Sequence, residues 1–175
     1  MHPPRALLAL SVFAVLTGAS VAALAQTPAN TVAYGPVATG ASAVVTLGSE
    51  EAALASDINQ QRAANAVAPL TVDPQLTAIA RARSQDQVSQ HYFSHTNPEG
   101  QTVFDLLDAA NIPWMAAGEN LAESNGLDAV QAAIDGFTKS PLHRANMLST
   151  DFTRVGVGAA ETADGTTIFS VVFTN

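Results

Sequence analysis

The spacing of the apolar residues changes once along this chain, just ahead of Arg154, and that change limits the fold classes open to it. Before it, apolar residues recur at helical spacing in four segments, 49–67, 73–90, 100–112 and 126–140. After it, residues 154–175 have a strand pattern interrupted by Asp164-Gly165, a dipeptide typical of a hairpin turn. Residues 118–124 are too few for a helix and are expected as another strand. Helices that come first, with strands paired late, predict an α+β fold built in layers.

Local signals mark where the predicted helices begin. Ser49 can cap the first helix, and acidic residues follow it in the first turn. Asp73 followed by Pro74 is typical of an N-cap and a first helical position. Thr102 and Asp105 have the spacing of a capping box. The apolar residues expected on the buried faces of the four helices are Leu54 and Ile58; Leu76, Ile79 and Ala80; Phe104 and Leu107; and Val130, Ile134 and Phe137.

The first 25 residues have the pattern of a secretory signal. An apolar run ends in Ala23-Leu24-Ala25, the small-x-small pattern that signal peptidase requires, so we expect cleavage after Ala25. A single membrane anchor is the alternative, but the run is short and rich in small residues, and the cleaved protein is not expected to stay inserted in a membrane. Residues 26–48 carry no charge and are rich in Thr, Ala, Gly and Pro, which is typical of a flexible linker. Residues 49–175 are then the folded domain of a secreted or periplasmic protein.

Charge and the absence of cysteine exclude several classes of function. The net charge of −8 repels phosphate backbones, so a nucleic-acid partner is not expected. The chain has no cysteine, which excludes disulfides, thiol nucleophiles and thiolate metal sites. An extracellular domain without disulfides favours a bacterial source over an animal or plant one. The charge, together with the lack of an obvious apolar surface stripe, favours a monomer.

The chain contains five phrases in this order: INQQRAANAVAPLTVDPQLTAIARARSQD, HYFSHTNPEGQTVFDLLDAANI, AGENLAES, SPLHRANMLSTDFTRVGVG and FSVVFTN. Together they resemble the bacterial branch of the CAP superfamily, which joins cysteine-rich secretory proteins, antigen-5 allergens and pathogenesis-related plant proteins. Each phrase alone is weak, but their order across most of residues 49–175 is specific. The resemblance implies a three-layer α-β-α sandwich with a central antiparallel sheet, a secreted location and a cleft on one side.

The resemblance also implies residues for that cleft, which the family lines with two histidines and two acids. By motif, His95, Glu119 and His143 occupy three of the four positions. The fourth, a glutamate in the eukaryotic members, is Ser140 here. Asp135 or Glu99 could compensate, although nothing in the sequence shows that either does.

Two interpretations of His95, Glu119 and His143 stay open. Two imidazoles and a carboxylate suit Zn²⁺ or another divalent cation with water in an open position, which would make these residues metal ligands and the candidate catalytic groups. Alternatively, a carboxylate between imidazoles satisfies their N–H groups in a hydrogen-bonded network that holds the cleft together without metal. The sequence spacings do not decide between the two.

Other polar residues are expected to have structural roles. His91 is predicted at a helix end on the surface, and residues 97–100 form a turn for which Pro98 and Gly100 supply the geometry. Asn120 and Asn146 are expected to tie loops to the backbone, and Arg144 to pair with a carboxylate.

Three functional hypotheses from different classes follow. The first is a non-enzymatic secreted binding module for a small or apolar ligand, a lipid, a sterol or a cell-envelope component. The second is a metal-dependent hydrolase acting on protein or cell wall, which the serine at position 140 disfavours because general-base catalysis often uses such a carboxylate. The third is a structural or stress-linked envelope protein whose cleft is vestigial. The first is the preferred hypothesis.

Overall fold

The computed structural model describes residues 6–7 and 47–175 of the chain. The predicted cleavage site after Ala25 and nearly all of the predicted linker 26–48 lie outside the described residues. The helices are α1 (Ser49–Ala64), α2 (Pro74–Gln90), α3 (Val103–Ala109), α4 (Ala129–Lys139) and α5 (Pro141–Leu148). The strands are β1 (Ala6–Leu7), β2 (Thr71–Val72), β3 (Ala116–Ser124), β4 (Arg154–Glu161) and β5 (Thr167–Thr174).

One sheet with the strand order β1-β3-β5-β4-β2 forms the middle layer. The long strands β3, β5 and β4 pair antiparallel, as expected for the central sheet. The short strands β1 and β2 pair parallel with β3 and β4 at the two edges, which makes the whole sheet mixed. Each edge pairing covers two residues of its strand, too short a pattern for the sequence to predict.

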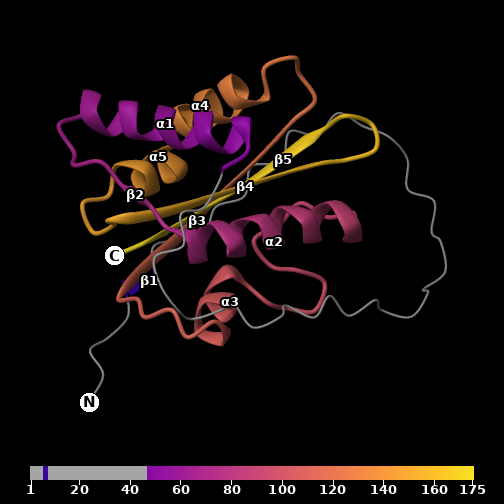
Figure 1. The fold of residues 1–175 in the computed structure, drawn as a ribbon, viewed down its shortest axis with the longest axis horizontal. Helices are drawn as coiled ribbons and strands as arrows, with labels where there is room; N and C mark the ends of the chain where they lie inside the picture. Colours follow the sequence, from indigo (N-terminus) through magenta and orange to yellow (C-terminus); the bar gives the residue numbers. More distant parts are fainter. Residues whose placement is uncertain (1–5, 8–46) are drawn as a thin grey trace.

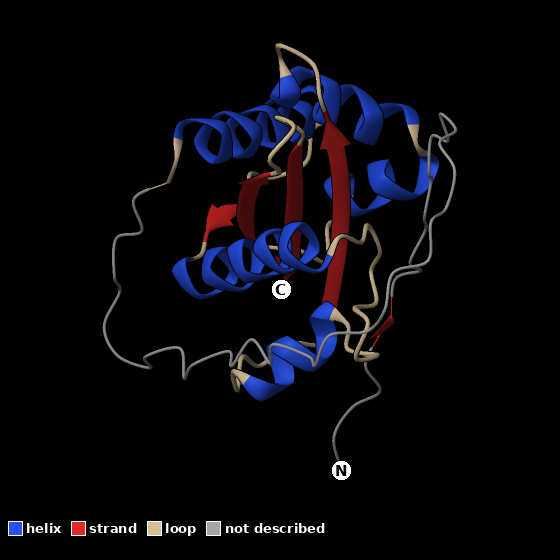
Figure 2. Ribbon diagram, turned by 90° about the vertical axis from the view of Figure 1, so that its right-hand side faces the viewer, coloured by secondary structure: helices blue, strands red, loops and turns tan. Residues whose placement is uncertain are grey.

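Helices cover both faces of this sheet, so the predicted α+β three-layer sandwich is confirmed (Figure 1). In Figure 1, α1, α4 and α5 lie above the sheet, and α2 and α3 lie below it. Figure 2 shows the long strands side by side between these helices. Separate apolar clusters fill the two interfaces: Leu54, Ile58 and Phe137 belong to the upper one, and Leu76 and Leu107 to the lower. Burial of these side chains supplies most of the driving force for folding.

Two glycines of β4 let α2 lie directly against the sheet. A Cβ atom at Gly156 would lie 2.1 Å from the backbone carbon of Leu76, and one at Gly158 would lie 2.2 Å from that of Ala80. Real Cβ atoms do not approach backbone this closely, so any side chain at either position would push α2 away. The resulting contact fixes the position of α2, which carries part of the candidate site described below.

The predicted helix starts are confirmed at α2 and α3 and shifted at α1. Asp73 accepts hydrogen bonds from the backbone N–H groups of Gln75 (2.8 Å) and Leu76 (3.0 Å), and Pro74 is the first helical residue. The Thr102 backbone N–H donates to Asp105 at 2.7 Å. At α1 the N-cap is Gly48 rather than Ser49, since the N–H of Gly48 donates to Glu51.

The predicted buried faces are largely confirmed, with two corrections. Eight of the ten predicted core residues are buried, but Phe104 and Val130 are only partly buried and pack at the edges of their clusters. The predicted helix 126–140 begins later, at Ala129, because Asp128 accepts a hydrogen bond from Gln131 N–H and caps it. The predicted strand 118–124 begins earlier, at Ala116.

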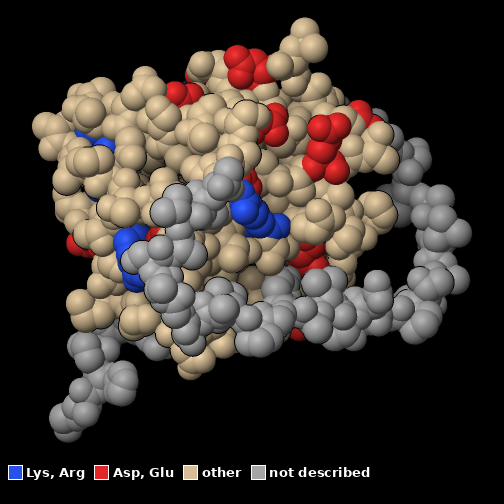
Figure 3. Space-filling view, in the orientation of Figure 1, with Lys and Arg blue, Asp and Glu red and all other residues tan. Residues whose placement is uncertain are grey.

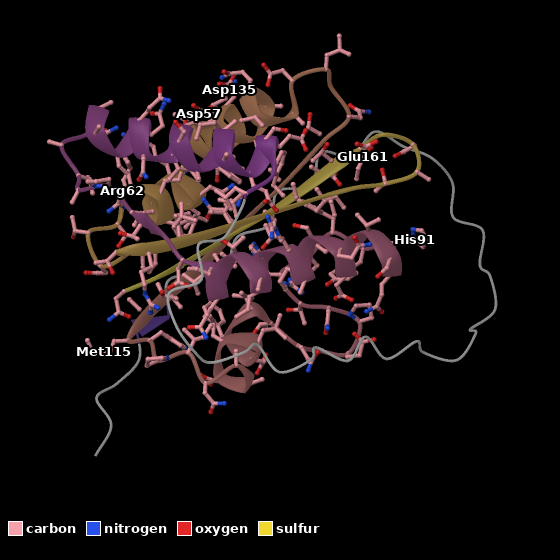
Figure 4. The ribbon with its side chains drawn as sticks, viewed as in Figure 1. Asp57, Arg62, His91, Met115, Asp135 and Glu161 are labelled. Carbon is pink, nitrogen blue, oxygen red and sulfur yellow. The ribbon has the colours of Figure 1, made fainter. Side chains whose placement is uncertain are left out.

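Arg62 joins the end of α1 to the end of α5. Its side chain is buried and donates to four backbone carbonyls: Ala68 (2.7 Å), Met147 (2.7 Å), Ser149 (2.9 Å) and Phe152 (3.3 Å). Figure 4 labels it near the C-terminal end of α1, beside α5. The cation therefore satisfies one carbonyl in the last turn of α5 and three carbonyls in the segments that follow α1 and α5.

Among the described residues, no helix combines the length and apolarity needed to cross a membrane.

Candidate functional site

Glu119 is the centre of the candidate site. Successive side chains of β3 point to opposite faces of the sheet. Gly118 faces Asn146 of α5, and Asn120 donates to the carbonyl of His143 in the same helix, whereas the side chain of Glu119 points to α2. Glu119 is 5% exposed, so its carboxylate depends on protein groups for its hydrogen bonds.

Three donors from three segments hold this carboxylate. Oε1 accepts from Arg83 Nε of α2 at 3.1 Å and from Ser170 Oγ of β5 at 3.1 Å. Oε2 lies 2.8 Å from Nδ1 of His95, which is in the loop after α2. Because a carboxylate oxygen accepts hydrogen bonds, Nδ1 of His95 is the donor in this contact.

Arg83 extends the network away from Glu119. It is fully buried, and its other nitrogens donate to the Tyr92 hydroxyl (2.9 Å) and the Ser94 carbonyl (3.0 Å). The Tyr92 hydroxyl in turn donates to Asp86, a second buried carboxylate, at 2.7 Å. One guanidinium thus lies between two buried carboxylates, with direct contact to one and contact through a hydroxyl to the other.

Sequence reasoning missed Arg83, although a signal for it exists. Leu76, Ala80, Arg83 and Gln87 follow one another at helical spacing, and all four are buried. A cation in phase with the apolar face of a helix needs a buried acceptor, and that pattern could have identified Arg83 as a partner for an acid elsewhere in the chain.

His143 comes from a different layer. It lies in α5, its ring packs edge-on against Phe137 with 5.4 Å between ring centroids, and its backbone carbonyl accepts from Asn120. The structure thus joins His95 and Glu119 directly and places His143 in the helix layer on the other face of the sheet. Within the described ranges, no three His, Asp or Glu side chains form a group that could hold a metal ion.

Ser140, at the position where the family resemblance expects a fourth acid, is a helix cap. Its Oγ accepts from the backbone N–H of His143 at 3.4 Å, and Pro141 is the first residue of α5. Neither acid considered as a replacement takes its place. Asp135 is exposed on α4, where Gln131 and Lys139 contact it (Figure 4). Glu99 is exposed and accepts from Gln90.

Two asparagines dock α5 onto β3. Asn146 Nδ2 donates to the Asn120 side chain (2.9 Å) and to the Glu119 carbonyl (3.3 Å). A Cβ atom at Gly118 would lie 3.1 Å from the Phe152 ring and 3.2 Å from Asn146 Oδ1, so the glycine permits this close approach. Asn120 and Asn146 do bond to backbone carbonyls, as expected, but they join a helix to a strand rather than tying a loop.

Three smaller expectations have clear outcomes. His91 is exposed at the end of α2 in the left-handed conformation (φ 55°), as expected for a helix-end residue (Figure 4). Residues 97–100 form the predicted turn, with Gly100 N–H donating to the Asn97 carbonyl at 2.9 Å. The expectation for Arg144 was wrong, because it donates to the amide oxygen of Asn65 and not to a carboxylate.

Hydrogen bonds from protein groups leave Glu119 little capacity to serve as a metal ligand. Zinc needs a ligand lone pair aimed at the ion, and hydrogen bonds from Arg83, Ser170 and His95 already use three of the four lone-pair positions of the Glu119 carboxylate, two on Oε1 and one on Oε2. The Arg83 guanidinium also balances the charge that would attract a cation. As arranged, Glu119 can orient His95 and anchor α2 and β5 to β3.

The order and spacing of these residues match a known protein family. Residues 55–173 match the family model described as CAP, the cysteine-rich secretory protein family. The chain belongs to the CAP family. This match covers more than half of the chain and confirms the predicted family resemblance.

Relatives of this CAP domain include two proteins of Bacillus subtilis (strain 168). YkwD, described as uncharacterised, is 35% identical over 103 residues, which cover 59% of this chain and 39% of YkwD. YlbC, described as an uncharacterised membrane protein, is 33% identical over 100 residues, covering 57% of this chain and 28% of YlbC. This chain therefore spans well under half the length of the curated relatives it matches.

Solved structures show the same CAP fold. An extracellular protein containing a SCP domain, from Bacillus anthracis, is 28% identical with a TM-score of 0.63, and the match covers 72% of this chain and 40% of that one. An outer surface protein of Borrelia burgdorferi is 21% identical with a TM-score of 0.67, and the match covers 75% of this chain and 96% of that one. The second likeness concerns the fold alone.

Proposed function

We propose that this CAP domain is a secreted, non-enzymatic binding module for a small or apolar ligand or a cell-envelope component. Export is supported by the signal pattern of residues 1–25 and by the extracellular description of the Bacillus anthracis relative. The ligand is expected near His95, whose imidazole orientation is fixed by Glu119. Such fixed orientation lowers the entropic cost of binding.

One observation carries the proposal, namely that both oxygens of the Glu119 carboxylate already accept hydrogen bonds from protein side chains. A general base must accept a proton from substrate or water within hydrogen-bond reach. Glu119 instead accepts from Arg83, His95 and Ser170. With Ser140 serving as a helix cap, this geometry supports a preorganised binding site better than the metal-dependent hydrolase considered as the alternative.

The surface supports the choice of ligand class. Among the described residues, exposed acidic residues such as Glu161 and Asp164 outnumber exposed basic ones, and two of the arginines, Arg62 and Arg83, are buried. Figure 3 shows acidic side chains gathered toward the end of the domain that carries the β4–β5 hairpin. Such a surface repels polyanions and leaves neutral or apolar ligands as the favoured class.

Binding assays on matched histidine variants test the proposal. The probes are a fluorescent long-chain fatty acid and an insoluble cell-envelope fraction, each mixed with the purified chain before and after chelator treatment. We expect binding of at least one probe that is indifferent to chelator, weakened in His95→Ala and unchanged in His91→Ala. The second variant removes an exposed histidine four positions away and controls for histidine loss as such.

The other outcomes select the alternatives. Chelator-sensitive hydrolysis of a casein or peptidoglycan substrate would contradict the proposal and establish the metal-dependent hydrolase. Loss of stability in His95→Ala, with neither probe bound by the unmutated protein, would favour the structural envelope protein with a vestigial site.

A further inference from the structure

Arg83 is the cation of a buried charge cluster that contains more acid than base. The Glu119 and Asp86 carboxylates are each at most 5% exposed, and Arg83 is fully buried between them. Burying a carboxylate without a compensating charge is strongly unfavourable. Arg83 compensates Glu119 directly, with 3.1 Å from Nε to Oε1, and reaches Asp86 through the Tyr92 hydroxyl.

The guanidinium is also held in place. Its three nitrogens donate to three different groups, the Glu119 carboxylate, the Tyr92 hydroxyl and the Ser94 carbonyl. Its helix, α2, is fixed against β4 at the two glycines that admit no side chain. Withdrawing Arg83 would leave all three acceptors without this donor and would open a void in a packed layer.

We propose that Arg83 is the resident cation of this site, a positioning residue that holds Glu119 and excludes divalent metal from it. A metal ion at Oε1 would lie beside a guanidinium that cannot move away, and like charges at such separation repel strongly where solvent is excluded. This inference goes beyond the proposed function, because it concerns the cation chemistry of the site and does not depend on the organic ligand.

Zinc titration by calorimetry on the full chain tests the inference, with no organic ligand present. Removal of the guanidinium in Arg83→Met leaves Glu119 as an uncompensated carboxylate beside His95. We expect Arg83→Met to bind zinc about tenfold or more tightly than the unmutated protein, the range typical of gaining or losing a carboxylate partner at a metal site. The gain should disappear in Arg83→Met combined with Glu119→Gln. Arg83→Lys, which keeps the positive charge, should behave like the unmutated protein.

A folded Arg83→Met variant that binds zinc no more tightly than the unmutated protein would overturn the inference. If Arg83→Met does not fold, Glu119→Gln in the unmutated background decides the question. We expect its zinc affinity to match that of the unmutated protein within error. A loss of about tenfold or more in Glu119→Gln would show that Glu119 ligates the metal despite Arg83, and would equally overturn the inference.

Discussion

Replacing Arg62 by methionine is the perturbation whose cost the structure defines most fully. Methionine keeps much of the side-chain length and apolar volume but none of the donors. Four backbone carbonyls lose their partner at once, two of them in buried contacts (Met147 and Phe152) and two in partly buried ones (Ala68 and Ser149).

The two buried carbonyls dominate the expected loss of stability. A buried acceptor left without a donor costs about 1–3 kcal/mol, so two of them cost about 2–6 kcal/mol. The partly buried pair can recruit water and adds little. Removing the guanidinium offsets part of this loss of stability, because the buried charge is itself unfavourable: burial disfavours the charged form and lowers the pKa of Arg62. We therefore expect a net loss of about 3 kcal/mol in the free energy of unfolding.

Urea denaturation followed by circular dichroism measures this difference. Arg144→Met is the matched control, since Arg144 is an exposed arginine that also contacts the C-terminal end of α1, through Asn65. The control should stay within about 0.5 kcal/mol of the unmutated protein, as is usual for surface substitutions. A loss below about 1 kcal/mol in Arg62→Met would refute the reasoning, because it would mean that the buried carbonyls do not depend on the cation.

Two further predictions concern the packing of α2 and the acid stability of α1. Gly156→Ala should destabilise the domain by about 3 kcal/mol or more, because the added methyl group would overlap the backbone of α2. Thermal unfolding of the purified variant measures this loss. A change below about 1 kcal/mol would contradict the described contact between β4 and α2. At Glu51, burial raises the pKa of the carboxyl, but hydrogen bonds from Arg81, Gly48 and Ala159 outweigh burial and hold that pKa below the usual 4.5. Its stabilising contribution is therefore complete above pH 4.5 and is lost as pH falls through the lower folded-state value. Unfolding free energies measured from neutral pH down to strongly acidic pH should fall less steeply in Glu51→Gln than in the unmutated protein, and equal slopes would contradict the assigned role.

The sequence predicted those features whose causes are local. Asp73 with Pro74, and Thr102 with Asp105, cap helices through contacts a few residues apart, and the structure contains both. The start of α1 was misplaced by one residue because the Glu51 side chain reaches back to Gly48, which makes a glycine the cap.

Features that depend on distant contacts were harder to predict. The family motif identified His95 and Glu119, and the structure joins them at 2.8 Å. The same motif also identified His143, which lies in α5 and whose backbone carbonyl accepts from Asn120. The helical spacing of Arg83 marks it as a buried cation, but its partner Glu119 is 36 residues away, and no local signal identifies that acid.

The alternation of β3 also limits how the length of this protein can change during evolution. Neighbouring side chains of the strand contact opposite layers. Glu119 bonds to Arg83 of α2, whereas Asn120 bonds to the His143 carbonyl of α5. A single inserted or deleted residue upstream in β3 would exchange these two faces, burying the carboxylate beside α5 and the amide beside Arg83. Length variation is therefore expected in loops, such as residues 125–128 between β3 and α4, whereas within the strand it should be tolerated only in steps of two.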